Sequence, residues 1–311
     1  MALLTAGPSA MDFENLKIVD LQIADVVSAG ATSISLKDGE WLYDFTGQFT
    51  YANDELSGGT LTGWRETFQG QVTFELTGFS IPVTTFIGWS EADANELARS
   101  TLLSGADSIV GSAFADRIYG YAGADTIEGG AGQDYLRGYV GDDLIRGGAD
   151  FDDVHGNEGN DTVYGGLGND WVVGGKDNDV QYGEDGADVV YGNLGDDTLN
   201  GGEGADWVRG GQQNDIVRGD AGDDWLAGDK GDDTLTGGAG ADLFHTHGDA
   251  GLDRVTDFNV LEGDRVNLLA GTTYTTAQVG ADVVINMGGG GQMVLVGVQL
   301  SSLGAGWIFG A

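Results

Sequence analysis

Sixteen aspartates recur every nine residues between positions 107 and 242, with no insertion or deletion in the series. Each one stands in a glycine-rich segment and is followed two residues later by an apolar side chain, with Gln181 as the exception. A hard cation such as Ca²⁺ takes six to eight oxygen ligands, and glycine turns offer carbonyl oxygens beside a carboxylate. We therefore expect calcium to be bound by Asp107, Asp116, Asp125, Asp134, Asp143, Asp152, Asp161, Asp170, Asp179, Asp188, Asp197, Asp206, Asp215, Asp224, Asp233 and Asp242.

The alternative to a metal site is a series of solvated acidic loops. A fixed short period indicates a solenoid, in which each repeat buries its apolar residue only by stacking on its neighbours. Stacked at strand spacing, sixteen unpaired carboxylates would repel one another severely. The pattern therefore favours bound cations over surface decoration.

The elements that position these aspartates are short strands and glycine turns. With the aspartate as the sixth residue of the nonapeptide, the eighth position is apolar in fifteen of sixteen repeats. Strand side chains alternate between faces, so a three-residue strand has room for one inward side chain, and this column is the predicted core. Gln181 interrupts it and needs a partner for its amide.

Glycine occupies the first position in all repeats but the opening one, and the fourth position in twelve of sixteen. Glycine is needed where the chain takes positive φ or where carbonyl groups crowd around an ion. At the fourth position Asp150 and Asp177 tolerate such a conformation, whereas Phe114 and Gln213 do not. We expect the last two loops to be distorted.

Residues 102–245 resemble the parallel β-roll of the RTX family, most clearly in the segments Gly129–Arg137, Gly165–Val173 and Gly201–Arg209. The resemblance implies an all-β, right-handed parallel β-roll solenoid in which two nonapeptides make one turn and each calcium lies between loops stacked on the same side. Eight loops in each column leave seven gaps, so the resemblance allows up to about 14 calcium ions.

The net charge of the chain and the cellular compartment that the resemblance implies both agree with folding on calcium outside the cell. The chain carries 50 acidic and 13 basic side chains, for a formal net charge of −37, so metal binding and folding should be one event. It has no cysteine and no apolar run of membrane-spanning length, and we expect no Sec-type leader. The resemblance implies a bacterial protein, secreted or surface-associated, that leaves through a type I secretion exporter. Nucleic acid is an unfavourable partner for so acidic a chain.

The N-terminal flank, residues 1–101, breaks the nonapeptide rule. Its β-like runs suggest a β-rich domain, and Ser90 can cap a helix over Glu91–Leu103. This domain either covers the open end of the solenoid or binds a ligand. The predicted strands are Thr32–Leu36, Glu40–Tyr51, Gly59–Phe68 and Gln71–Val83.

The C-terminal flank, residues 246–311, is predicted to be a β cap that carries the secretion signal. Asp253, Asp257 and Asp264 match the segment that closes RTX rolls, and the resemblance leaves them as ligands of a terminal ion or as turn caps. A β-hairpin is expected from Ala281–Met287 and Gln292–Val298.

No sequence motif of a zinc protease or of a serine hydrolase is present, so we expect a non-catalytic protein; an unfamiliar active site within residues 1–101 is the remaining enzymatic alternative. His245 and His247 lie on one strand face and could hold a transition metal, although two ligands are an incomplete set.

One outward face concentrates large apolar side chains at the seventh position of alternate repeats. Such a row needs covering, either by the chain's own flanks, by another copy, or by a glycan stacked on the rings. We expect a structural or self-assembling surface or matrix component that associates through this face or through the ends of the solenoid; a calcium-dependent adhesin or carbohydrate-binding module is the alternative. The candidate interface residues are Tyr135, Trp171, Val189, Trp207, Trp225 and Leu243.

Overall fold

The computed structural model describes residues 3–6, 25–29, 33–38, 41–52, 55–68, 71–82 and 103–310. The predicted helix over Glu91–Leu103 lies outside these residues except for Leu103, which is buried in a turn. The chain forms two compact units, Met1–Leu144 and Ile145–Ala311. Domain boundaries after residues 101 and 245 stay a prediction.

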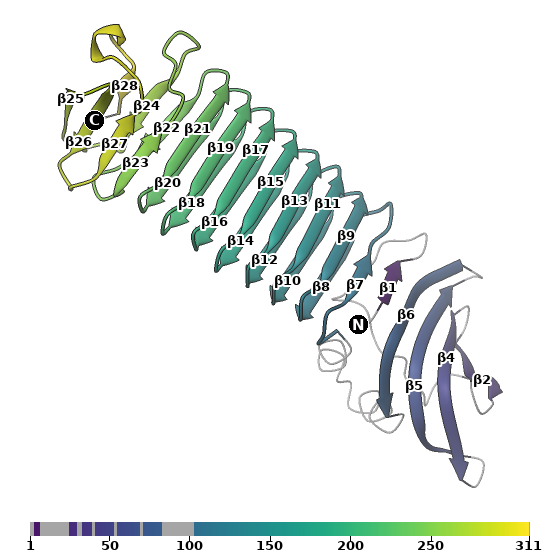
Figure 1. Cartoon of the computed structure of the whole chain (residues 1–311). Helices are drawn as coiled ribbons and strands as arrows, with labels where there is room; N and C mark the ends of the chain where they lie inside the picture. Colours follow the sequence, from purple (N-terminus) through teal and green to yellow (C-terminus); the bar gives the residue numbers. More distant parts are fainter. Residues whose placement is uncertain are drawn as a thin grey trace. The chain divides into compact units, whose positions relative to one another are not determined.

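The first unit begins with an antiparallel sheet in the order β2, β3, β4, β5, β6, β1 (Figure 1). Its strands are β1 (Leu3–Ala6), β2 (Asp25–Ala29), β3 (Ser33–Asp38), β4 (Trp41–Ala52), β5 (Glu55–Phe68) and β6 (Gln71–Pro82). The four predicted strands are confirmed as β3 to β6, whereas β1 and β2 were not anticipated.

β1 also pairs in parallel with β7 (Ser108–Val110), the first strand of the repeats, so that Leu4 lies opposite Ile109. An edge strand exposes unpaired N–H and C=O groups, and β1 fills those of β7. The N-terminal sheet is therefore joined to the first repeat by backbone hydrogen bonds.

The repeats form two parallel sheets in which each strand pairs with the strand two repeats further along the chain (Figure 1). In the first unit β7 pairs with β9, and β8 with β10. In the second unit Trp171 lies opposite Val189, eighteen residues later. Two nonapeptides therefore make one turn, as the family resemblance implied.

Each repeat contributes one strand. The strands are β8 (Arg117–Ala122), β9 (Thr126–Ala131), β10 (Tyr135–Val140), β11 (Leu144–Ala149), β12 (Asp153–Glu158), β13 (Thr162–Leu167), β14 (Trp171–Lys176), β15 (Val180–Asp185), β16 (Val189–Leu194), β17 (Thr198–Glu203), β18 (Trp207–Gln212), β19 (Ile216–Ala221), β20 (Trp225–Lys230), β21 (Thr234–Ala239) and β22 (Leu243–Thr246).

The eighth-position column is the core, as predicted. All sixteen side chains are 0% exposed, from Ile109 to Phe244, and Gln181 is among them. The strands are mostly six residues long rather than three, because ladder pairing continues beyond the first-position glycine: Glu184 lies opposite Gly202 and Asp185 opposite Glu203. That glycine is the second inward position of each strand, and it adds no side chain to the core.

The C-terminal region adds strands to both sheets of the repeats. An antiparallel meander then pairs with the last repeat-like strand of one sheet. β23 (Leu252–Val255) pairs with β21, and β24 (Arg265–Leu268) pairs with β22. β25 (Tyr274–Val279), β26 (Asp282–Met287) and β27 (Gln292–Leu295) form an antiparallel meander whose last strand pairs with β23, and β28 (Ile308–Phe309) pairs with β24. The predicted hairpin is confirmed as β26 and β27.

Candidate calcium sites

Within each unit the repeat aspartates are stacked in two columns, and all sixteen are at most 3% exposed. A hydrogen bond joins successive aspartates of a column inside each unit. In it, Oδ1 of one aspartate accepts the backbone N–H of the aspartate eighteen residues earlier. The N–H of Asp170 donates to Asp188 Oδ1 at 2.7 Å, and that of Asp179 donates to Asp197 Oδ1 at 2.8 Å. This series of hydrogen bonds holds each aspartate side chain in a buried position and uses one of its two carboxylate oxygens.

The second carboxylate oxygen has no such partner. Within the part of the chain that the structure describes, no hydrogen bond reaches the buried Oδ2 atoms of Asp125, Asp170, Asp179, Asp188, Asp197, Asp206, Asp215, Asp224 and Asp242. Burying a polar group without a hydrogen bond is costly, and a buried charge is normally paired or coordinates a metal. These oxygens are the donors that a cation would use.

The orphaned oxygens point at the first-position glycines. A Cβ atom built on Gly183 would lie 2.4 Å from Asp188 Oδ2 and 2.4 Å from the carbonyl oxygen of Gly201 in the next turn. Gly192 has the same surroundings, with Asp197 Oδ2 at 2.4 Å and the Gly210 carbonyl oxygen at 2.5 Å. We call this space, bounded by a first-position glycine, its aspartate Oδ2 and the carbonyl of the following turn, the glycine cradle.

The glycine cradle explains why the first position is glycine, since any side chain would collide with backbone and carboxylate oxygens. Carboxylate and carbonyl oxygens converging from successive turns are the ligand type that Ca²⁺ prefers. The residues present therefore fit a calcium ion.

Burial changes the acidity of these carboxyl groups in the protein without metal. Desolvation, followed by the charges of neighbouring aspartates in the column, raises the pKa of Asp179 and of Asp215 to about 8. Desolvation likewise raises the pKa of Asp188 and Asp224 to about 7. The turns thus disfavour ionised carboxylates unless positive charge accompanies them, and a divalent cation would supply that charge.

Among the residues that the structure describes, no three His, Cys, Asp or Glu side chains converge on one point. This result agrees with the repeat, because each nonapeptide contributes one buried aspartate to its column and the neighbouring oxygens at the glycine cradle belong to the backbone. Side-chain clusters alone would therefore miss these sites.

Beyond the repeats, two further aspartates extend the two columns. Arg254 lies opposite Thr234, which places Asp253 beside Asp233, at the end of the column that contains Asp215 and Asp233. Burial, and then the charge of Asp233, raises the pKa of Asp253 to about 8, and Thr246 Oγ1 donates to its Oδ2 at 3.1 Å. Asp253, predicted as a ligand, is thus buried at the end of its column.

Asp264 ends the second column, since its Oδ1 accepts the N–H of Asp242 at 3.0 Å and its Oδ2 accepts the N–H of Asn259 at 2.7 Å. Asp257 lies elsewhere: it accepts the N–H groups of Gly237 and Gly238 at 3.0 and 2.8 Å. These bonds are those of a turn cap, the second of the two roles considered for this residue; metal binding by it stays a prediction.

The turns contain a conformational requirement that the sequence pattern did not disclose. From Tyr121 onward the second position of every repeat takes positive φ, including Tyr121, Tyr139 and Glu184. At the fourth position Gln213 adopts φ 77° rather than distorting its loop, whereas Phe114 avoids positive φ and donates its N–H to Ser112 Oγ at 3.1 Å. The predicted distortion is confirmed for Phe114 and wrong for Gln213.

The predicted interface residues of the second unit lie on the outer face of the sheet that contains β14, β18 and β20, and Tyr135 lies on β10 of the first unit. Trp171 and Trp207 are 44% and 47% exposed in the described structure. Trp207 and Trp225 have ring centroids 4.7 Å apart, and Trp225 stacks on His245 at 5.1 Å. We call this surface the tryptophan face: Tyr135, Trp171, Val189, Trp207, Trp225 and Leu243.

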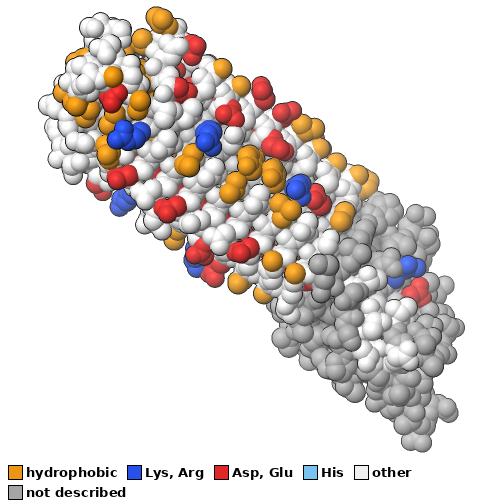
Figure 2. Space-filling view, in the orientation of Figure 1, with side chains coloured by type: hydrophobic (Ala, Val, Ile, Leu, Met, Phe, Trp, Pro, Cys, Tyr) orange, Lys and Arg blue, Asp and Glu red, His pale blue; other side chains and the backbone are white. Residues whose placement is uncertain are grey.

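Both units carry parts of this row, and the surroundings differ along it. In the first unit the Tyr135 ring lies beneath the guanidinium groups of Arg117 and Arg137, at 4.9 and 3.6 Å from its centroid. In the second unit Val189 and Leu243 are half-buried. Hydrophobic side chains also reach the surface in the space-filling view, with acidic side chains among them (Figure 2).

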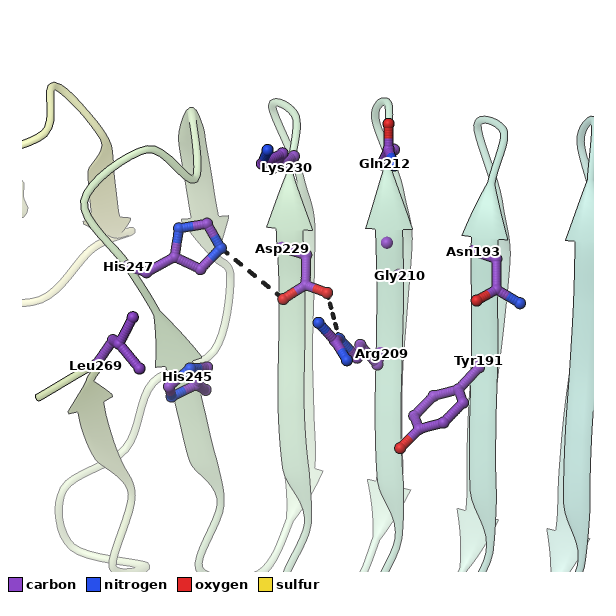
Figure 3. A pocket seen from close by; sticks show the side chains of 11 residues that line it. Tyr191, Asn193, Arg209, Gly210, Gln212, Asp229, Lys230, His245, His247 and Leu269 are labelled. Atoms are coloured by element: carbon purple, nitrogen blue, oxygen red, sulfur yellow. Dashed lines mark hydrogen bonds and ion pairs between the residues drawn. The ribbon is translucent and has the colours of Figure 1, made fainter.

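The two C-terminal histidines line a pocket of about 500 Å³ with Tyr191, Arg209, Asp229 and Lys230 (Figure 3). His247 Nδ1 lies 3.0 Å from Asp249 Oδ1, and its Nε2 lies 3.9 Å from Asp229 Oδ1. Asp229 also pairs with Arg209. No third ligand joins His245 and His247 in the described structure, so the structure gives no support for a transition-metal site there.

Among the described residues, no helix has the length and apolar character needed to cross a bilayer. Curated proteins gave no match to the chain. Two solved structures that match are the solution structure of the AlgE6R3 subunit of the Azotobacter vinelandii mannuronan C5-epimerase and the crystal structure of the extracellular lipase LipA from Serratia marcescens.

The epimerase subunit is 25% identical, with 40% of this chain and 81% of that chain covered and a TM-score of 0.30. The lipase is 16% identical, with 74% of this chain and half of that chain covered and a TM-score of 0.26. A family model for the RTX calcium-binding nonapeptide repeat matches residues 103–136, 122–154, 146–181, 182–217 and 218–254. Residues 103–254 of this chain are therefore RTX calcium-binding nonapeptide repeats.

Proposed function

We propose that the protein is a non-catalytic, extracellular structural component of a bacterium whose repeats fold when they bind calcium. The orphaned Oδ2 atoms carry this proposal, because a fold that buries them gains its full stability only with a cation beside them. Extracellular calcium modules bind with dissociation constants of roughly 10⁻⁴–10⁻³ M, well above cytosolic calcium. The chain would then leave the cell unfolded through a type I exporter and fold outside.

The same proposal assigns self-association to the tryptophan face. Trp171 and Trp207 are too large and too exposed to be ordinary surface residues, and tryptophan is enriched at the centres of interfaces. In one of the two sheets, β1 occupies the edge of β7 and β27 occupies the edge of β23, which leaves these two strand edges without free backbone groups for end-to-end growth. The proposal therefore assigns self-association to lateral packing through the tryptophan face rather than to these two strand edges.

Light scattering with calcium and then with chelator tests the assembly. We expect large particles with calcium and a loss of them when Trp171 and Trp207 are both changed to Thr. Ile216→Thr is the matched control, because Ile216 is 40% exposed and lies on a strand of the other sheet. A monomer at high protein concentration in both conditions would refute assembly.

A second candidate function is glycan binding. The pocket of Figure 3 places Tyr191, Arg209 and Asp229 near the stacked rings of Trp225 and His245, and aromatic faces beside hydrogen-bonding side chains suit a sugar. A glycan pull-down with calcium separates the two candidates. Retention of a glycan that is lost in Arg209→Ala would favour the binding module over the pure scaffold.

A further inference from the structure

The single polar residue of the core column, Gln181, is 0% exposed. Its Nε2 donates to the backbone carbonyl of Tyr191 at 3.3 Å, which is a long hydrogen bond. Its Oε1 accepts no hydrogen bond from any described residue. A buried amide oxygen in this state destabilises the fold unless something outside the chain satisfies it.

A second orphaned oxygen lies in the same repeat. Asp179 Oδ2 is buried and also lacks a hydrogen-bond partner among the described residues. A Cβ atom built on Gly174 would lie 1.9 Å from Gln181 Nε2 and 2.3 Å from Asp179 Oδ2. The end of the Gln181 side chain and the carboxylate of Asp179 therefore flank one point, at the glycine cradle of their own turn.

The neighbouring repeats show what is unusual about this turn. At Gly183 and at Gly192 the two nearest oxygens are an aspartate Oδ2 and a backbone carbonyl. The eighth-position side chains of those repeats, Val190 and Leu199, are apolar and offer no ligand atom. At Gly174 alone, among these turns, a side chain from the core reaches the cradle.

A half-turn of the Gln181 carboxamide about its last bond exchanges Oε1 with Nε2 and brings Oε1 to the cradle. Two orphaned oxygens then lie close together beside Gly174, and one cation between them would satisfy both, since carboxylate and amide oxygens are ordinary calcium ligands. The rotation gives up the weak bond to Tyr191 and moves Nε2 to the place where Oε1 had no partner, and the bound cation must outweigh both costs. No rearrangement of the backbone is needed.

We propose that Gln181 Oε1 is an additional ligand of the calcium ion at the Asp179 turn, which makes this site the tightest of the repeats and the first to fill. The inference rests on the calcium binding proposed above. Asp179 is the ninth of the sixteen aspartates, so the strongest site stands in the middle of the repeats. Since each repeat contacts only its neighbours, folding would start there and spread in both directions.

The test compares the full-length protein with Gln181→Met, in which the side chain keeps its length and loses its oxygen. Calcium binding is followed by isothermal titration calorimetry and folding by far-ultraviolet circular dichroism. We expect one tight site in the unaltered protein. Loss of a metal-site partner weakens binding by about 10–100-fold, so Q181M should lose that site and begin to fold at higher calcium, with the same final spectrum.

Leu199→Met is the matched control, because Leu199 lies opposite Gln181 on the neighbouring strand of the same sheet. It places the same methionine in the same column and removes no oxygen, so its tight site should be unchanged. A Q181M variant that binds calcium as the unaltered protein does would overturn the inference.

A third variant covers failure of Q181M to fold at saturating calcium. Gln181→Glu retains an oxygen at the same place and should keep the tight site; its loss in Q181E would also overturn the inference. The proposed function fails differently, since the unaltered protein would then show no folding on calcium. If the unaltered protein folds on calcium but all its sites are equivalent, only the role of Gln181 is refuted.

Discussion

Replacing one ladder aspartate by asparagine should have opposite effects with and without calcium. In Asp188→Asn the amide oxygen can still accept the N–H of Asp170, a hydrogen bond of 2.7 Å in the structure. The amide nitrogen would replace Oδ2 and could donate to the Gly201 carbonyl, which shares the glycine cradle. The hydrogen-bonded ladder is therefore preserved while the negative charge is removed.

The size of the effect follows from the acidity of Asp188. Burial raises its pKa from 3.8 to about 7, so the ionised group destabilises the metal-free fold at pH 8. Three pKa units correspond to a ceiling of roughly 4 kcal/mol, and solvent screening together with a compact unfolded chain lowers the expected gain to about 1–2 kcal/mol. With calcium, the lost charge should weaken calcium binding at this turn.

The assay uses two titrations at pH 8, each followed by circular dichroism. Trimethylamine N-oxide favours burial, so in metal-free buffer D188N should fold at a lower concentration of this osmolyte than the unaltered protein. In calcium, D188N should fold at a higher calcium concentration. Asp185→Asn is the control, because Asp185 is exposed in the same turn and the charge change is identical. A D188N variant less stable than the unaltered protein in both titrations would refute the reasoning, since the carboxylate would then be needed without metal.

Three further predictions concern the turns, the core and pH. Gly183→Ala should abolish calcium-induced folding around its turn, because the new Cβ would lie 2.4 Å from the Gly201 carbonyl oxygen, whereas Gly105→Ala, with no atom within 4 Å, should fold normally; equal calcium midpoints for the two would contradict the glycine cradle. Leu199→Ala should lower the free energy of unfolding in saturating calcium by about 2–5 kcal/mol, measured by denaturant titration, and a loss below about 1 kcal/mol would show that the column is not close-packed. The folded-state pKa values of Asp179, Asp188 and Asp215 are raised to about 7–8, so their contribution to metal-free stability is full below pH 4 and is lost as pH rises through 7–8. The circular dichroism signal of β structure in metal-free protein should therefore increase as pH is lowered from 8 to 5. A decrease of that signal over the same interval would contradict the predicted direction.

The periodic features were predictable because each of them repeats. The apolar core from Ile109 to Phe244 follows from the spacing, whereas the two-repeat turn and the two aspartate columns were implied by the family resemblance; the structure confirms all three. The glycine requirement at the first position was also visible in sequence. Its cause is visible only in the three-dimensional structure, where Asp188 Oδ2 and the Gly201 carbonyl oxygen leave no space for a side chain at Gly183.

Features that depend on non-periodic contacts were not predictable. β1 precedes the repeats by about a hundred residues in sequence, and nothing in its four residues indicates pairing with β7. The positive φ at Tyr121 and Tyr139 was hidden because tyrosine rarely takes this conformation; here the repeat imposes it. Asp253, Asp257 and Asp264 look alike in sequence, and only the register of β23 and β24 shows which two continue the columns.

Hydrogen exchange measured by mass spectrometry, with calcium and after exhaustive chelation, tests the central claim most directly because it reports on each strand. Folding on calcium predicts that the amides of β12 to β22 are protected with calcium and exchange at the rate of an unfolded chain without it. Equal protection of these strands in both conditions would contradict the account, since the repeats would then be stable with their carboxylate oxygens orphaned.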